Sequence, residues 1–245
     1  DLNGTKIGVI DSLLENSAWH SQDKKHPYLL APVDLQAVKA CGVTFAQSML
    51  ERVIEERAKG DPSAAQGIRN DIQKVIGLDL ESIIPGSSEA ELLKEVLINK
   101  DMWSQYLEVG IGPDAEVFTK AQPMSVMGIG AQIGILEKSE WNNPEPEITL
   151  AVNARGKILG ATLGNDVNLR DIEGRSALLL GKAKDNNASA AIGPFIRLFD
   201  ENFSLDDVRM AELSLTVRGL DQFTLHGRSS MSKISRDVAD LLMKQ

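Results

Sequence analysis

The sequence predicts an α+β fold in which helices and strands occupy different parts of the chain. Between residues 44 and 99, apolar residues recur at intervals of three and four, as on one face of a helix. From residue 106 onward, the chain consists mostly of short strand-like runs separated by turn residues. Because the two kinds of element are segregated rather than alternating, we expect a helical segment placed ahead of a strand-rich part.

The individual elements follow from local patterns. Thr44 and Gln47 form a capping-box pattern at the start of a first helix. Asp61-Pro62 begins a second helix, which is expected to end near Gly77, and residues 89–99 form a third. Strands are expected at residues 5–10, 116–120, 211–217 and 223–226, with a last helix at residues 232–244.

Composition excludes several classes of protein. The 245 residues carry a net charge of −9, so we expect neither nucleic acid nor an acidic membrane surface as a partner. No apolar run approaches the ~20 residues of a membrane span. The single Cys41 cannot form an internal disulfide and no signal peptide is visible, which predicts a reducing, cytoplasmic location. The chain begins at Asp1 rather than Met, so we expect residues upstream of it in the natural protein.

Nucleotide and zinc sites are not indicated. Gly128-Ile-Gly130 with Gly134 departs by one residue from the dinucleotide-binding fingerprint, and no helix pattern follows it. The histidines His20 and His26 have no cysteines at zinc-binding spacing. We therefore expect no nucleotide cofactor and no zinc.

A β-hairpin is predicted in the middle of the strand-rich part. The partly β-branched run at residues 148–152 predicts one strand, and residues 157–163 predict the next. Between them, Asn153-Ala-Arg-Gly156 has the composition of a turn. If these four residues form the loop, Val152 pairs with Lys157, and this pair sets the register of the hairpin.

This register gathers three carboxylates on one face of the hairpin. Glu147 then lies opposite Thr162, and Glu145, Glu147 and Asp166 share a face because side chains alternate with period two. A loop of odd length would break this arrangement. Neighbouring carboxylates repel one another, and a hard divalent cation such as Mg²⁺ relieves the repulsion. The alternative is an ordinary surface hairpin whose acidic residues face water.

The sequence around these carboxylates resembles the fumarylacetoacetate hydrolase family. The resemblance covers roughly residues 38–240, and its motifs stand in the family's order and at its separations. The motifs are Asn143-Pro-Glu-Pro-Glu147, Gly164-Asn-Asp-Val-Asn-Leu-Arg-Asp171, Lys184 and Ile192-Gly-Pro194.

The resemblance implies a fold and an assembly. Residues 38–245 are expected to form a mixed β-roll or sandwich with peripheral helices and a helical insertion near its start, usually as a homodimer. Residues 1–37 are expected to end a small N-terminal region. Family members carry a further segment of the type G-D-x-I-x-T-G-T-P towards the C-terminus. This sequence lacks it, so we expect the C-terminal part of the domain to be missing.

The resemblance also implies a metal site. In the family, the E-x-E pair and the Asp of the N-D-x-x-x-R-D motif hold Mg²⁺ or Mn²⁺, which implies Glu145, Glu147 and Asp166 here, with Ca²⁺ as an alternative ion. Lys184 matches the family lysine that contacts metal-bound water or substrate, with Lys182 as the competing position. Lys120 matches a lysine of the active-site wall, its alternative being a solvated charge at a strand end.

Arg170 is a further candidate, because a guanidinium can bind a substrate carboxylate bidentately. Its alternative is an ion pair with Asp171 that holds the turn. Asn165 and Asn168 are expected to hydrogen-bond the loop backbone.

One position departs from the family's hydrolases. Glu51 matches the acid of a His–Glu pair that activates water, but Ser48 stands where the histidine would be. Glu51 is therefore the candidate base, with a solvated helix face as its alternative, and Ser48 joins the candidates for substrate binding.

The implied function is a divalent-metal-dependent enzyme for a small 2-oxo acid. Gly42-Val-Thr-Phe45 and the run from Gly164 to Gly174 are similar to family members that dehydrate 2-keto-3-deoxy sugar acids. Both dehydration and C–C hydrolysis of the fumarylacetoacetate or acylpyruvate type would use a metal-stabilised enolate at C3. The alternative is a catalytically inactive relative that keeps the fold as a binding or oligomeric module, which Ser48 and the missing C-terminal segment suggest.

Overall fold

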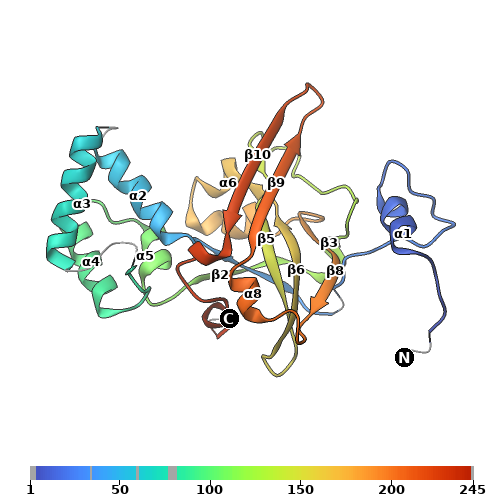
Figure 1. The fold of residues 1–245 in the computed structure, drawn as a ribbon. Coiled ribbons are helices and arrows are strands. Elements are labelled where there is room, and N and C mark those ends of the chain that lie inside the picture. The colour runs from blue at the N-terminus through green and yellow to red at the C-terminus, as the bar shows by residue number, and fades with distance from the viewer. Residues whose placement is uncertain (1–3, 34, 59–60, 77–81, 244–245) are drawn as a thin grey trace. The chain divides into compact units, whose positions relative to one another are not determined.

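The computed structural model describes residues 4–33, 35–58, 61–76 and 82–243 (Figure 1). Contacts within the chain divide it into two compact units. The strand unit comprises Asp1–Ala40 and Thr119–Ser229, and the helical unit comprises Cys41–Phe118 and Ser230–Gln245. The boundaries between the units fall within three strands, β1 (Val38–Gly42), β2 (Glu116–Ala121) and β10 (Thr224–Ser230), of which β1 and β2 pair with each other. The expected domain boundary after residue 37 stays a prediction.

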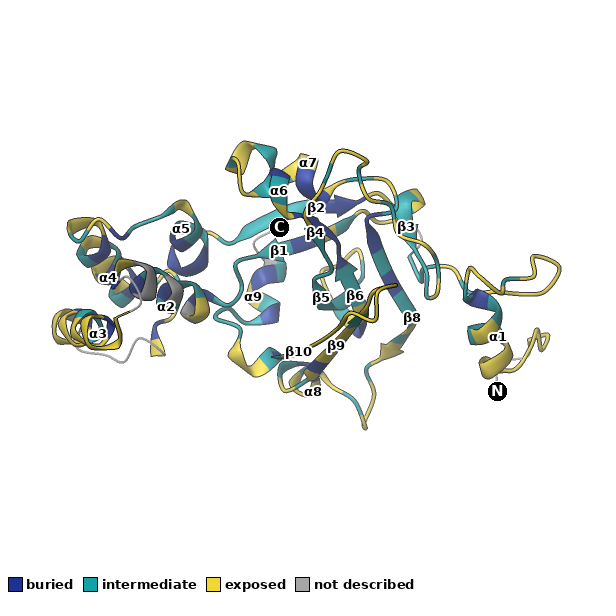
Figure 2. Ribbon diagram, turned by 90° about the horizontal axis from the view of Figure 1, so that it is seen from above, coloured by how far each residue is buried: buried dark blue, intermediate teal, exposed yellow. Residues whose placement is uncertain are grey.

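The helical unit confirms the early cluster of helices. Its α-helices are α2 (Ala46–Arg57), α3 (Pro62–Ile76), α4 (Ser88–Asn99), α5 (Gln105–Ile111) and α9 (Val238–Met243). Buried residues repeat at helical spacing, as with Leu50 and Ile54 in α2 and Leu93 and Leu97 in α4. The buried and exposed sides of these helices can be followed in Figure 2. Helices this short depend on such a buried stripe, because they are marginal in isolation.

Helix ends differ slightly from those expected. α2 begins at Ala46, one residue later than a cap at Thr44 predicts. The backbone N–H of Ala46 donates to the hydroxyl of Ser235 at 2.9 Å, so a residue distant in sequence caps the helix. The expected cap Gly77 lies outside the described residues. The last helix begins only at Val238, after a 3₁₀ turn at Met231–Lys233.

The strand unit contains a four-stranded sheet in the order β3-β8-β6-β5. Its strands are β3 (Val126–Met127), β8 (Ala190–Leu198), β6 (Ile158–Asp166) and β5 (Pro146–Val152). The β5–β6 and β6–β8 pairs are antiparallel, whereas β3 runs parallel to β8.

The strand unit also contains several smaller elements. Two further strand pairs are β4 (Asn142–Asn143) with β7 (Asn168–Leu169) and β9 (Glu212–Arg218) with β10 (Thr224–Ser230). The unit also contains α1 (Ile10–Ser17), α6 (Arg170–Glu173), α7 (Leu180–Lys184) and α8 (Leu205–Arg209), with 3₁₀ turns at Pro123–Ser125 and Ala177–Leu179. The expected strand at residues 5–10 was wrong, because residues 4–9 form no strand and Ile10 begins α1. Among the described residues, no helix is both long and apolar enough to span a membrane.

The hairpin formed by β5 and β6 has a different register from the one predicted. Glu147 pairs with Gly164, not with Thr162. The loop between the paired residues Val152 and Ile158 has five residues, and the pairing then shifts to Ala151 with Gly160, which leaves Leu159 as an extra residue. An odd loop and one bulged residue together change the register by an even number. The acidic residues therefore keep a common face, although for a reason that the sequence pattern did not show.

Candidate metal centre

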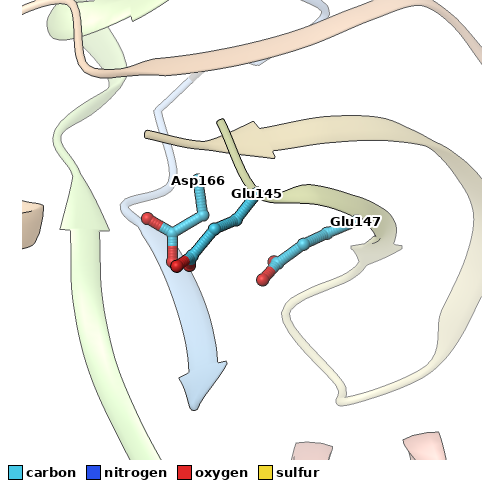
Figure 3. Close-up of side chains that lie close together, drawn as sticks. All are labelled: Glu145, Glu147 and Asp166. Atoms are coloured by element: carbon cyan, nitrogen blue, oxygen red, sulfur yellow. The ribbon is translucent and has the colours of Figure 1, made fainter. Parts of the chain in front are cut away.

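The three predicted ligands lie together in the strand unit. Each of Glu145, Glu147 and Asp166 offers an oxygen that lies within 4.8 Å of those of the other two. Figure 3 shows their carboxylate groups pointing towards one another, with Glu145 immediately before β5, Glu147 within it and Asp166 at the end of β6. The backbone N–H of Asp166 donates to the carbonyl of Glu145 at 2.9 Å, which ties the two strand ends together. The predicted gathering of these carboxylates is confirmed.

Gly164 lies beside the cluster, close to a hydroxyl of the neighbouring strand. Gly164 lies between Thr162 and Asp166 on this face of β6. A Cβ atom at Gly164 would lie 2.3 Å from Oγ1 of Thr149 on the neighbouring strand. A side chain at this position would therefore have to displace the Thr149 hydroxyl, close to where β5 and β6 carry the carboxylates.

Lys184 forms ion pairs with two of the three carboxylates. Its Nζ lies 2.5 Å from Oε2 of Glu145 and 3.0 Å from Oδ2 of Asp166. Lys184 ends the short helix α7, whose buried Ala183 packs with Leu169 and Ile172. This small apolar cluster fixes the helix end from which Lys184 reaches the carboxylates.

Lys120 lies beside the Oδ1 atom of Asp166 and is buried, with 2% of its surface exposed. Its Nζ donates to the carbonyl of Val167 at 3.0 Å, to the hydroxyl of Ser189 at 3.1 Å and to the carbonyl of Lys184. It also lies 3.2 Å from Oδ1 of Asp166. An ammonium has three protons, so these acceptors occupy it fully. The alternative of a solvated lysine at a strand end was wrong.

The charges of the cluster shift one another's pKa values. Burial, and then repulsion from Asp166 and Glu145, raise the pKa of Glu147 to about 8. Burial opposes the charged form of Lys184, but attraction to Asp166 and Glu145 outweighs it and the pKa of Lys184 is raised. The pKa of Lys120 is lowered, because burial outweighs its attraction to Asp166.

The donor set fits a hard divalent cation. Two lysines offset only part of the charge of three carboxylates, and the oxygens are ligands that Mg²⁺, Mn²⁺ and Ca²⁺ accept. Among the described residues, the Glu147 carboxylate has no hydrogen-bond or ion-pair partner. The buried Oδ1 of Asp166 accepts no hydrogen bond from the described residues, although the ammonium of Lys120 lies close to it as an ion pair. Such uncompensated oxygens are costly without a cation, which supports a metal site here.

The residues that follow Asp166 have mostly structural partners. Arg170 pairs with Glu173 at 3.2 Å, so the expected Arg170–Asp171 pair is not formed. Asp171 instead accepts hydrogen bonds from the Ser139 hydroxyl at 2.7 Å and from the Glu140 backbone N–H at 3.1 Å. It thus holds the loop that leads into β4.

The two asparagines near Asp166 behave differently. Asn165 accepts from the backbone N–H of Glu145 at 3.1 Å, so the expected backbone contact is present. For Asn168 the prediction was wrong, because its amide donates to the side chains of Glu145 and Glu173. No local pattern indicates these partners, since an Asn in a loop motif more often bonds the nearby backbone.

Glu51 and Ser48 belong to the helical unit. The single Nε–H of Arg69 is shared between the two carboxylate oxygens of Glu51, at 3.2 and 2.9 Å, and Nη2 of Arg69 donates to Oε2 at 2.5 Å. The Glu51 side chain is 42% exposed, which suits the alternative of a solvated helix face with an ion pair. Ser48 is exposed on α2. The catalytic role of Glu51 and the substrate contact of Ser48 stay predictions.

Two curated relatives of the chain are sugar-acid dehydratases by name. The chain is 33% identical over 141 residues to the probable 2-keto-3-deoxyxylonate dehydratase of Haloferax volcanii. The aligned segment is 58% of this chain and 47% of the relative. The chain is also 40% identical over 94 residues to the 2-dehydro-3-deoxy-D-arabinonate dehydratase of Saccharolobus solfataricus, which is 37% of this chain and 32% of the relative. The chain thus spans less than half the length of each relative. No family model matches it.

Solved structures with the same architecture include two of particular use. A 2-keto-3-deoxy-D-arabinonate dehydratase complexed with magnesium and 2,5-dioxopentanoate aligns with 57% of this chain and 49% of its own, at 29% identity and a TM-score of 0.54. Cg1458 with an inhibitor aligns with 90% of this chain and 64% of its own, at 18% identity and a TM-score of 0.53. The fold is shared. The expected α+β architecture is therefore confirmed, and the named relatives agree with the dehydratase side of the resemblance.

Proposed function

We propose that this chain carries the metal-binding catalytic site of a dehydratase for 2-keto-3-deoxy sugar acids, within the fumarylacetoacetate hydrolase family. The observation that carries the proposal is the cluster of Glu145, Glu147 and Asp166 with Lys184. Its support is the similarity to dehydratases of five-carbon 2-keto-3-deoxy acids, one of them solved with magnesium. A homodimer and a small 2-oxo acid partner belong to the same proposal.

The reaction sets clear chemical demands. In a 2-keto-3-deoxy pentonate, the keto group at C2 acidifies the C3 protons, and the hydroxyl at C4 is placed for elimination. Loss of one C3 proton to a base and of the C4 hydroxyl as water leaves an unsaturated 2-oxo acid, which becomes 2,5-dioxopentanoate by moving protons alone. Negative charge therefore develops on the C2 oxygen. Mg²⁺ held by the three carboxylates would supply Lewis-acid stabilisation of that charge.

The chain's own residues divide the remaining work. Lys184 stays protonated, because its pKa is raised, and it holds a positive charge beside Glu145 and Asp166 where an anionic substrate would bind. One such electrostatic contact typically contributes about 2–4 kcal/mol to the transition state. Lys120 has acceptors for all of its protons, so we assign it to holding Asp166 rather than to the substrate.

The proposed base is Glu51, and a proposed substrate-binding group is Arg170. Glu51 is occupied by Arg69, so it can accept a proton only when that pair opens. Arg170 is 44% exposed and paired with Glu173, which leaves other donors of its guanidinium for a substrate carboxylate.

The deciding experiment is an assay of the full-length protein with Mg²⁺. We expect 2,5-dioxopentanoate from 2-keto-3-deoxy-D-arabinonate or from 2-keto-3-deoxyxylonate, and loss of that activity in Glu147→Gln. Release of pyruvate from acylpyruvates, without dehydration, would replace the dehydratase by a hydrolase. If metal-replete protein turned over neither class of substrate, the inactive binding module would be the better description.

A further inference from the structure

Asn168 lies completely buried between two carboxylates of the strand unit. Its Nδ2 donates to Oε1 of Glu145 at 3.1 Å and to Oε2 of Glu173 at 2.6 Å. Both neighbours are acceptors, so the nitrogen of the amide must face them and the orientation of the amide is fixed. The strand β7 that carries Asn168 is itself held by the buried Leu169.

Glu145 is consequently held at both of its oxygens. Asn168 binds Oε1, with a longer contact from Asn143 at 3.5 Å, and Lys184 binds Oε2 at 2.5 Å. Glu147, in contrast, has no such partner among the described residues. The cluster therefore combines a ligand of fixed orientation with one that is left for the cation.

Glu173 completes the arrangement from the other side. Its Oε2 accepts from Asn168 and also from Nη1 of Arg170 at 3.2 Å. Arg170 offsets the charge of Glu173. Because Glu173 holds the amide of Asn168 in place, that amide orients Glu145, and being neutral it adds no charge there. Among the described residues, neither Asn168 nor Glu173 forms a hydrogen bond with Glu147 or Asp166.

We propose that Asn168 and Glu173 are positioning residues that fix Glu145 and thereby raise the affinity of the cluster for its divalent cation. This inference rests on the proposed function in one respect, that the cluster binds a divalent cation. Groups that orient metal ligands typically contribute 10- to 100-fold in affinity, which is about the size expected for Asn168.

The test is calorimetric titration of metal-free full-length protein with Mn²⁺ and with Mg²⁺. We expect Asn168→Ala to weaken binding by about 10- to 100-fold. Glu173→Ala should also weaken it, whereas Glu173→Gln should bind nearly as wild type, because the Gln oxygen can still accept from Asn168. This rescue separates orientation from charge and from general stability.

A matched control is available in the turn between β5 and β6. Asn153→Ala removes hydrogen bonds that Asn153 accepts from the N–H groups of Arg155 and Lys157, at 2.9 and 3.0 Å, in the turn. It should lower the unfolding temperature in EDTA and leave metal affinity unchanged. If Asn168→Ala does not fold, the two Glu173 variants decide.

Unchanged affinity in Asn168→Ala, or equal losses in both Glu173 variants, would overturn the inference. Wild-type protein that binds no divalent cation would instead overturn the proposed function, so the two failures are distinguishable.

Discussion

Replacing Glu147 by Gln should stabilise the metal-free protein while abolishing its tight binding of Mg²⁺. The folded protein raises the pKa of Glu147 from 4.5 to about 8. A carboxyl whose pKa is raised by folding binds its proton more tightly in the folded state. Its contribution to the free energy of unfolding is therefore fully present below pH 4.5 and is lost as the pH rises towards about 8. At pH 7 the loss is about 3 kcal/mol, from roughly 1.4 kcal/mol for each unit above the unfolded value.

Gln has the shape of the protonated acid and cannot ionise, so the variant avoids this loss. In EDTA at pH 7 its unfolding temperature should exceed that of wild type by several degrees, since about 1 kcal/mol corresponds to 2–4 °C at this size. The difference should vanish near pH 4.5, and saturating Mg²⁺ should reverse it, because the cation binds the ionised wild-type cluster. Thermal unfolding of both proteins at pH 4.5, 7 and 8.5 measures this. Equal stability at every pH in EDTA would refute the reasoning.

Three further changes probe the lysines and the candidate base. Lys184→Met should lower kcat by about 100-fold or more, because it removes a positive charge beside the reacting substrate. It should also strengthen Mg²⁺ binding, because the ammonium competes with the cation for the same carboxylates. Weaker Mg²⁺ binding by calorimetry would contradict this. Lys120→Met should cost about 3–5 kcal/mol of unfolding free energy, because it leaves Asp166 and buried oxygens without their cation, and a loss below about 1 kcal/mol in denaturant titration would argue against its positioning role. Glu51→Gln should change stability by at most about 1 kcal/mol, as for an exposed ion pair, and its kcat decides whether Glu51 is the base: a fall below about one hundredth supports that role, and an unchanged kcat removes it.

The sequence predicted the elements whose cause is local. The apolar repeats of α2, α3 and α4 and the run of β5 are visible in any short window, because burial of one face dictates them. Helix ends were less predictable, since Ser235 caps α2 from 189 positions away. The carboxylate cluster was found because its residue types and spacing were specific, together with the resemblance of the surrounding motifs.

The surroundings of residues that depend on tertiary packing could not be read from local patterns. Nothing in the sequence near Lys120 shows that Val167 and Ser189 will surround it, so its burial could not be predicted. The same holds for Asn168, whose partner Glu145 lies 23 positions earlier. Polar networks of this kind arise from long-range contacts, whereas sequence patterns report local periodicity.

The five-residue turn and the extra residue Leu159 have a consequence for how this protein can vary. Surface turns ordinarily gain and lose single residues freely, because nothing buried depends on their length. Here a lone insertion or deletion between Val152 and Ile158 that shifts the strand pairing by one residue would turn Glu145 and Glu147 to the opposite side of the sheet, unless the irregularity at Leu159 changed with it. Related chains should therefore differ in this turn by pairs of residues, or by one residue together with a gain or loss of the bulge.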